Sequence, residues 1–301
     1  MRKYVGKRIV TFALLALEAC AGSPSPTHNG IRAVNDPEVI ERGRYLVYGP
    51  AHCASCHGRH SADRTQQGTE PPLSGGKRFE LGMLGALVAP NITSDEQTGI
   101  GGLTDDSLVR SLRYGISRDG QPLAPVMGFA ELSDADLQAV ISFLRTLPAV
   151  PGPGLREELT WLGSIVLPVM LRPQAPDSAP PAHVEPQPSV YYGRYLAHSV
   201  ANCRGCHTPR SQITGRFTDA DFSGGMRWEE PAGTFVAPNL TPVPDGIIDT
   251  LDETGFIERF RVENRGATGS PMPWEAYGEM TDLELVAIYR YLRSLSPADR
   301  T

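Results

Sequence analysis

The chain has 301 residues with 31 glycines and 27 prolines, which favours two small, loop-rich domains over one large sheet. Its formal net charge is −6; beyond residue 19 the chain has 24 basic and 33 acidic residues, and Lys77 is the only lysine there. A nucleic-acid partner is therefore excluded on electrostatic grounds.

The N-terminus has the order of a secretory signal peptide, which we assign to residues 1–19. A basic start precedes an apolar run at 9–17, which is shorter than the roughly 20 residues that span a bilayer. The following Leu17-Glu18-Ala19-Cys20 resembles a lipobox, so Cys20 is a candidate for lipidation and 20–35 is expected to be a flexible tether. Ordinary cleavage nearby, which leaves Cys20 lost or idle, is the alternative. We expect a periplasmic or exported protein, with membrane association through a lipidated Cys20.

The rest of the chain repeats itself. "GRYL" at 43–46 returns at 193–196, "CASCH" at 53–57 returns as "CRGCH" at 203–207, and "VAPNIT" at 88–93 returns as "VAPNLT" at 236–241. Because these landmarks keep their order, we predict two copies of one module, at 36–149 and 188–299. A Pro-rich linker at 150–187 joins them. Its apolar middle, 159–173, is expected to pack between the modules; the alternative is a partner-docking or membrane-contacting strip.

Helix signals predict the elements in chain order. Asp36 and Pro37 favour a helix start that runs to about Tyr48, and a shorter helix is expected over 104–114 with a counterpart near 251–262. Ser133 and Thr281 are expected N-caps of the last helix of each module. Those helices repeat apolar residues at the spacing of one helical face, at Leu137, Val140, Ile141 and Leu144 and at Leu285, Ile288, Tyr289 and Leu292. Few alternating strands are evident, so the predicted fold class is all-α with long loops.

The cysteine pairs define the chemistry. Zinc could use the cysteines with nearby histidines of "AHCASCHGRH", but the second copy, "NCRGCHTPR", repeats only C-x-x-C-H. A redox dithiol would leave the repeated histidine unexplained. C-x-x-C-H is the attachment signature of c-type haem, in which two sulfurs on one helical turn bond the porphyrin and the next imidazole faces the iron. We therefore predict two covalently bound haem c groups, held by Cys53, Cys56, His57, Cys203, Cys206 and His207. His52 and His60 are interpreted as solvated loop histidines.

The second axial ligand decides whether such a haem only carries electrons or also binds small molecules. Met127 and Met272 each follow a proline closely, precede an aromatic residue and lie just before the last helix of their module. We predict them as the iron ligands opposite His57 and His207. Met280 aligns with Leu132 and is expected in the core.

These motifs resemble the class I cytochrome c fold, used twice, over about 36–148 and 188–297. The resemblance implies that Pro90 and Pro238, in "APNIT" and "APNLT", accept a hydrogen bond from the haem-ligating imidazole. The stretch "NITSDEQTGIGGLTDDSLVRSLRYG" at 91–115 is similar to the cytochrome c subunits of bacterial membrane-associated dehydrogenases that oxidise alcohols, sugar acids or aldehydes.

The expected function is a diheme c-type cytochrome that relays single electrons between an exported dehydrogenase and a respiratory acceptor. We expect an electron carrier or the electron-transfer subunit of a dehydrogenase, rather than an enzyme in its own right. Its partners are then redox proteins. The alternative is a diheme peroxidase-like oxidoreductase with one open haem.

Overall fold

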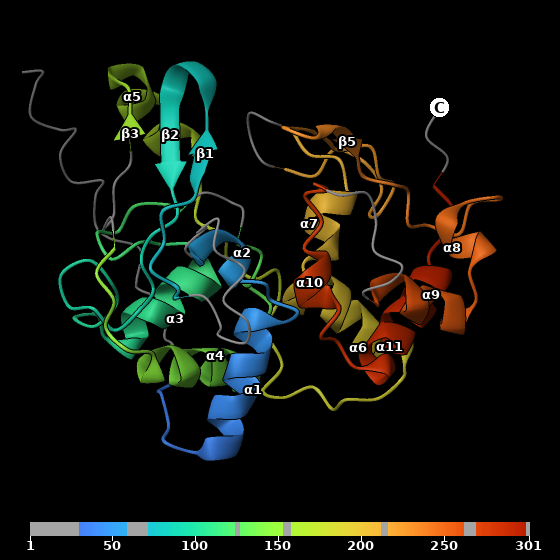
Figure 1. Cartoon of the computed structure of the whole chain (residues 1–301), viewed down its shortest axis with the longest axis horizontal. Coiled ribbons are helices and arrows are strands. Elements are labelled where there is room, and N and C mark those ends of the chain that lie inside the picture. The colour runs from blue at the N-terminus through green and yellow to red at the C-terminus, as the bar shows by residue number, and fades with distance from the viewer. Residues whose placement is uncertain are drawn as a thin grey trace, which may run out of the picture.

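The computed structural model describes residues 30–58, 72–123, 127–152, 158–211, 216–261 and 269–298. Two halves lie side by side, one from the blue-to-green part of the chain and one from the yellow-to-red part (Figure 1). The predicted signal peptide, Cys20, His60 and residues 20–29 of the predicted tether lie outside the described residues.

The first half, module 1, is organised by two crossing helices. α1 (Pro37–Tyr48) begins at Asp36, whose carboxylate accepts hydrogen bonds from two amides of the first turn. α4 (Asp134–Thr146) is capped by Ser133, and α2 (Ala54–His57) and α3 (Asp105–Tyr114) complete the helices. A side-chain Cβ on Gly43 would lie 2.0 Å from the Ala139 carbonyl oxygen. The glycine of "GRYL" therefore allows α1 and α4 to cross in backbone contact.

The second half, module 2, repeats this crossing. α6 (Val190–Tyr195) continues as a π-helical turn at Leu196–Val200, and it packs on α11 (Asp282–Arg293). A Cβ on Gly193 would lie 1.8 Å from the Ala287 carbonyl oxygen, as at Gly43. The shorter helices are α7 (Cys203–His207), α8 (Ile247–Thr250), α9 (Glu253–Phe260) and α10 (Trp274–Tyr277). Thr281 is the N-cap of α11, as expected, and it forms a complete capping box with Glu284.

The all-α expectation is wrong for the loops between the second helix and the "VAPN" segment. β1 (Arg78–Glu80) and β2 (Gly85–Val88) form an antiparallel hairpin, with a 3-10 turn at Gly82–Leu84 between them, and β3 (Glu158–Leu159) adds a third strand beside β2. Module 2 has the matching hairpin of β4 (Arg227–Glu230) and β5 (Gly233–Val236). Strands of two to four residues are too short to leave an alternating hydrophobic pattern in the sequence.

Two further boundaries differ from the expectation. Residues 30–35 are not a free tether, because Ile31 is buried and the Ala33 and Val34 amides donate to Asp105 and Ser142. The apolar middle of the linker does not lie between the modules: it forms β3 and α5 (Trp161–Met170), which pack on the module 1 hairpin (Figure 1). No helix within the described ranges is both long enough and apolar enough to cross a membrane.

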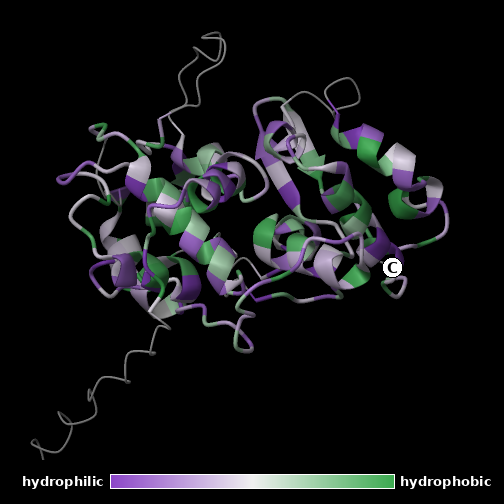
Figure 2. Ribbon diagram, turned by 90° about the horizontal axis from the view of Figure 1, so that it is seen from below, coloured by the Kyte–Doolittle hydropathy of each residue, from purple (hydrophilic) through white to green (hydrophobic). Residues whose placement is uncertain are grey.

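One hydrophobic core extends through both modules. The helices carry apolar residues along one side and polar residues along the other (Figure 2). The predicted inward faces of α4 and α11 are confirmed, since all eight of their apolar positions are buried. We call α4 and α11 the closing helices, because each is the last helix of its module. Burial of their apolar side chains stabilises their packing against α1 and α6 by about 25 cal/mol for each Å² removed from water.

Candidate haem sites

Each C-x-x-C-H sequence forms a single helical turn. The His57 amide donates to the Cys53 carbonyl at 2.8 Å, which places both module 1 thiols on one side of that turn. The preceding residues, His52 and Asn202, have φ of +40° and +47°. Both types tolerate this left-handed region better than most residues do, and it lets the chain turn abruptly into the helix. Across the described ranges, no group of three or more His, Cys, Asp or Glu side chains forms a metal-binding cluster.

The two imidazoles are held in the same way. His57 Nδ1 lies 2.8 Å from the Pro90 carbonyl oxygen, and His207 Nδ1 lies 3.0 Å from that of Pro238. Burial lowers the pKa of both imidazoles, and the hydrogen bond to the proline carbonyl opposes this in part. Each ring is therefore neutral and donates from Nδ1. Nε2 remains, with no hydrogen bond to a described residue, as the nitrogen that can ligate iron.

A repeated glycine explains why the proline carbonyl reaches the histidine. Gly75 and Gly224 have φ of +77° and +72°, and their amides donate to the His57 and His207 carbonyls at 2.8 Å. A Cβ on Gly75 would lie 2.5 Å from the Ala89 carbonyl oxygen, and one on Gly224 would lie 2.5 Å from the Asn239 amide nitrogen. These glycines belong to "SGG" sequences at 74–76 and 223–225, which form one close backbone contact with the repeated "VAPN" segments.

Two asparagines stabilise this contact, and the sequence analysis did not single them out. Asn91 Nδ2 donates to the Val150 carbonyl and Asn239 Nδ2 to the Ala298 carbonyl, both at 2.8 Å. Each amide therefore joins the proline loop to the chain just after the closing helix of its module. The signal was present, since each asparagine directly follows the repeated proline.

Met127 and Met272 are half-buried and pack against the hydrophobic core. Phe129, just after the first, is buried. Near the second, Trp274 has its indole N–H buried without a hydrogen-bond partner in the described part of the chain. Met280 is buried in the core, as expected. Ligation of iron by Met127 and Met272 stays a prediction.

Comparison with known proteins decides the family. A family model described as cytochrome c matches residues 40–148, within module 1. A "Diheme cytochrome c-type" protein of Cereibacter sphaeroides is 30% identical over 221 residues, which cover 69% of this chain and 71% of that protein. The chain belongs to the cytochrome c family.

Two further relatives of this cytochrome have names that mention dehydrogenases. The cytochrome c subunit of the quinone alcohol dehydrogenase of Komagataeibacter europaeus is 28% identical over 95% of this chain and 60% of its own length. The fructose dehydrogenase cytochrome subunit of Gluconobacter japonicus is 27% identical over 85% of this chain and 52% of its own length. The chain thus spans little more than half the length of these relatives.

Membership of the family implies covalently bound haem c. The residues present fit that group, since each site combines two free thiols on one turn with a buried neutral imidazole whose Nε2 is available. Burial raises the pKa of Cys53 and of Cys203 to about 12, so these thiols are protonated before attachment.

His52 is not the solvated loop residue that the sequence suggested. Its ring is half-buried and packs edge-on against Tyr277 of module 2, with ring centroids 5.6 Å apart. Burial lowers the pKa of His52 to about 4, so the ring is neutral. The expectation failed because only the tertiary fold brings module 2 against this loop.

The helices of the two C-x-x-C-H sequences, α2 and α7, are called the attachment helices, and they meet at the interface between the modules. A Cβ on Gly128, next to Met127, would lie 2.7 Å from Oδ1 of Asn202, next to Cys203. The contact of His52, next to Cys53 of module 1, with Tyr277 of module 2 is the corresponding contact with the modules exchanged. Burial raises the pKa of the Cys206 thiol, and the Cys56 thiol of the other module raises it further. The ends of the two modules that carry C-x-x-C-H therefore face each other.

A reciprocal pair of hydrogen bonds joins the modules beside these sites. The Tyr45 hydroxyl of module 1 donates to Glu284 of module 2, and the Tyr195 hydroxyl of module 2 donates to Asp136 of module 1 at 2.7 Å. Both tyrosines come from the repeated "GRYL", and both carboxylates occupy the third position of a closing helix. The interface is thus built like a two-fold dimer contact within one chain.

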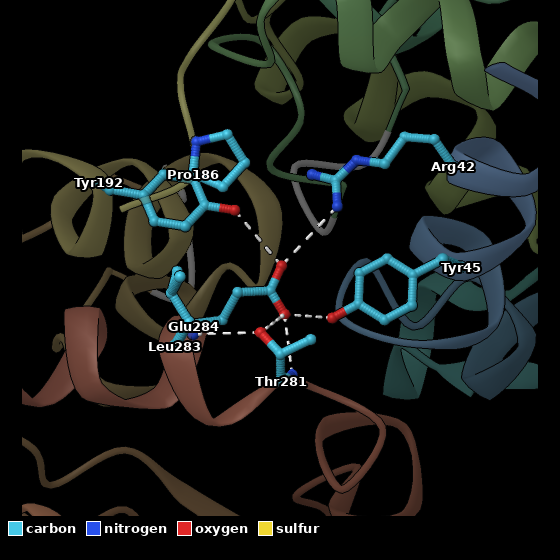
Figure 3. A pocket seen from close by; sticks show the side chains of 7 residues that line it. All are labelled: Arg42, Tyr45, Pro186, Tyr192, Thr281, Leu283 and Glu284. Atoms are coloured by element: carbon cyan, nitrogen blue, oxygen red, sulfur yellow. Dashed lines mark hydrogen bonds and ion pairs between the residues drawn. The ribbon is translucent and has the colours of Figure 1, made fainter. Parts of the chain in front are cut away.

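Arg42 breaks this symmetry. Its guanidinium lies 2.9 Å from Asp136 and 3.7 Å from Glu284, at the edge of a pocket of about 420 Å³ (Figure 3). The corresponding position in module 2 is Tyr192, whose hydroxyl donates to Glu284 at 3.4 Å. Burial raises the pKa of Tyr45, and the neighbouring Glu284 carboxylate raises it further. The phenols consequently stay protonated and act as donors to the carboxylates.

Proposed function

We propose that this cytochrome holds two haem c groups, one in each module, and passes single electrons between an exported dehydrogenase and a respiratory acceptor. The observation that carries the proposal is the duplicated arrangement of two thiols, a buried histidine and a proline carbonyl. Haem iron bound at these sites would supply the one-electron chemistry. The chain contributes the binding, the orientation and the exclusion of water.

Each group of residues then has a distinct part. Cys53 and Cys56 hold the first haem through thioether bonds, as Cys203 and Cys206 hold the second. His57 and His207 would ligate iron through Nε2, and their Nδ1 atoms lie 2.8 and 3.0 Å from the carbonyl oxygens of Pro90 and Pro238, which would orient the rings. Met127 and Met272 would each supply a thioether sulfur as the second protein ligand of an iron, which would leave no position open to small molecules.

The packing of the modules supports a relay between the two sites. Module 1 contacts module 2 on both flanks of the attachment helices, through His52 with Tyr277 and through Gly128 with Asn202. The bonds of Tyr45 and Tyr195 to the facing carboxylates hold this arrangement rigid. Such an interface would keep the two candidate haem sites close together, which favours transfer of an electron between them.

The partners are proposed from the relatives and from charge. Relatives named as cytochrome subunits of alcohol and fructose dehydrogenases make a dehydrogenase the natural electron donor. The acidic chain, with one lysine beyond residue 19, suits partners that present basic patches. From the predicted signal peptide we propose a periplasmic or exported protein, to which lipidation of Cys20 would add a membrane anchor.

The test is the binding of carbon monoxide to the reduced protein, followed by absorption. Wild type is expected to bind none rapidly, and Met127→Ala and Met272→Ala are each expected to open one haem. Met280→Leu is the matched control, since Met280 is a buried core residue eight positions after Met272.

Two results would contradict the proposal. Rapid carbon monoxide binding by wild type, accompanied by peroxide turnover, would support the peroxidase-like alternative. An unchanged spectrum and potential in Met272→Ala would refute that ligand. The haem count is tested separately: a Cys53→Ala, Cys56→Ala variant should retain half of the covalent haem of wild type.

A further inference from the structure

The module 1 hairpin ends in an exposed apolar projection. It consists of the turn at Leu81–Leu84 and of α5 (Trp161–Met170), and we call it the apolar tip. It rises above the helices of module 1 (Figure 1). Met83, Trp161 and Ile165 are 81%, 77% and 63% exposed, the highest values of any large apolar side chain in the described residues. So much apolar surface in one place marks an interaction site.

Charge is absent from the tip and present at its base. Neither 81–88 nor 159–171 contains Asp, Glu, Lys, Arg or His. Arg78 forms ion pairs with Glu80 and with Glu158 where the strands enter the tip, and Arg172 follows α5. The projection is therefore apolar at its end and ringed by charged groups, which matches the layering of lipid chains below head groups.

The polar groups at the start of α5 are bonded within the tip itself. Thr160 Oγ1 donates to the Met83 carbonyl at 2.8 Å, the Thr160 amide donates to the Leu84 carbonyl at 3.1 Å, and Ser164 Oγ donates to the Thr160 carbonyl at 3.0 Å. The Gly163 amide donates to Thr160 Oγ1. Internal pairing of this kind is what a hydrocarbon environment requires, because unpaired polar groups there cost several kcal/mol.

The other module shows that the fold does not need this feature. Its corresponding hairpin turns at Pro231 and Ala232, between β4, which ends in the charged residues Glu229 and Glu230, and β5. The module 2 hairpin is two-stranded, whereas β3 and α5 extend that of module 1. The apolar tip is thus an addition to one copy of a duplicated module, and the cytochrome core does not account for it.

We propose that the apolar tip inserts into the interfacial layer of a lipid membrane. Trp161 lies at the N-terminal end of α5, and an indole suits the boundary between head groups and acyl chains. At ten residues α5 is about 15 Å long, too short to span a bilayer, so the contact is one-sided. Module 1 would then be held with its hairpin toward the membrane.

The experiment uses the haem-loaded protein exported behind a signal that is cleaved after Cys20, so that no acyl chain is attached. Flotation with vesicles of phosphatidylcholine, with and without phosphatidylglycerol, measures the bound fraction by haem absorbance. Wild type is expected to float, with little change at high salt, because apolar insertion is not screened.

The variants distinguish binding through the apolar tip from non-specific adsorption of the protein to vesicles. Trp161→Ser with Ile165→Ser is expected to lower vesicle binding at least about tenfold, through the loss of buried apolar area. Tyr191→Ser with Val190→Ser is the matched control: these residues are 62% and 45% exposed on α6 of module 2, and their change should leave binding unaltered. Met83→Gln tests the turn independently of α5. Unchanged haem and far-ultraviolet spectra will show that each variant folds.

The inference is overturned if wild type is found only in the vesicle-free fraction, if the control pair lowers binding as much as the tip pair, or if binding vanishes at high salt. A concentration-dependent dimer that the tip variants abolish would show instead that a second copy covers the tip. None of these outcomes depends on the haem count or on the electron-transfer proposal.

Discussion

Arg42 offers the sharpest test of how the modules are held together. Replacement by Met keeps most of the side-chain length but removes the cation between Asp136 and Glu284, whose side chains are 12% and 5% exposed. Two hydrogen bonds to Asp136, at 2.9 and 3.3 Å, are lost. A hydrogen bond to a charged group contributes about 1.5–3 kcal/mol.

The expected destabilisation is smaller than the combined contribution of these two hydrogen bonds to Asp136. The Arg42 side chain is 31% exposed, and Tyr195 and Tyr45 still donate to the two carboxylates. We therefore expect Arg42→Met to lower the free energy of unfolding by about 2–3 kcal/mol, below the about 3–5 kcal/mol for breaking a fully buried pair.

Urea unfolding of the haem-loaded protein, followed by circular dichroism and by haem absorbance, measures the effect. Arg44→Met is the control in the same helix, because the Arg44–Glu41 pair is 45% and 62% exposed and should contribute less than about 1 kcal/mol. The two probes should also separate in Arg42→Met, since a weakened interface lets one module unfold before the other. Equal unfolding midpoints for the two variants would refute this account of the interface.

Two further perturbations test the site and the pH response. Gly224 has φ +72°, and a Cβ there would lie 2.5 Å from the Pro238 and Asn239 backbone, so Gly224→Ala should lower the free energy of unfolding by more than about 2 kcal/mol and alter the spectrum of one haem. Gly120 has φ +78° with nothing within 4 Å, so Gly120→Ala should lower it only by the backbone strain of about 1–2 kcal/mol. Equal urea midpoints for the two variants would contradict the close contact at Gly224. Burial lowers the pKa of His198 from its ordinary value to about 4, so the stability that its neutral ring contributes is full above about pH 6.5 and is lost as the pH falls toward 4. In His198→Phe, urea midpoints at about pH 7 and about pH 5 should therefore differ less than in wild type, and an equal difference would show that His198 does not contribute.

Local signals in the sequence determined much of this protein. The Asp36 cap, the Thr281 capping box and the buried faces of α4 and α11 followed from residues within two turns of one another. The repeat of C-x-x-C-H indicated the cofactor chemistry, and the resemblance of "APNIT" and "APNLT" to a cytochrome c motif indicated the prolines that lie against both histidines. Duplication helped because residues that recur in both copies stand out from those that do not.

Only the tertiary structure showed which residues of the two modules contact each other. His52 looks like a solvated histidine until Tyr277 of the other module packs on it, and 159–173 looks like a spacer until β3 joins the hairpin. The bonds of Tyr45 to Glu284 and of Tyr195 to Asp136 join residues 239 and 59 positions apart. No local propensity or periodicity encodes such contacts, because they depend on how two finished modules pack. That packing sets where the two C-x-x-C-H helices meet and which apolar face stays exposed.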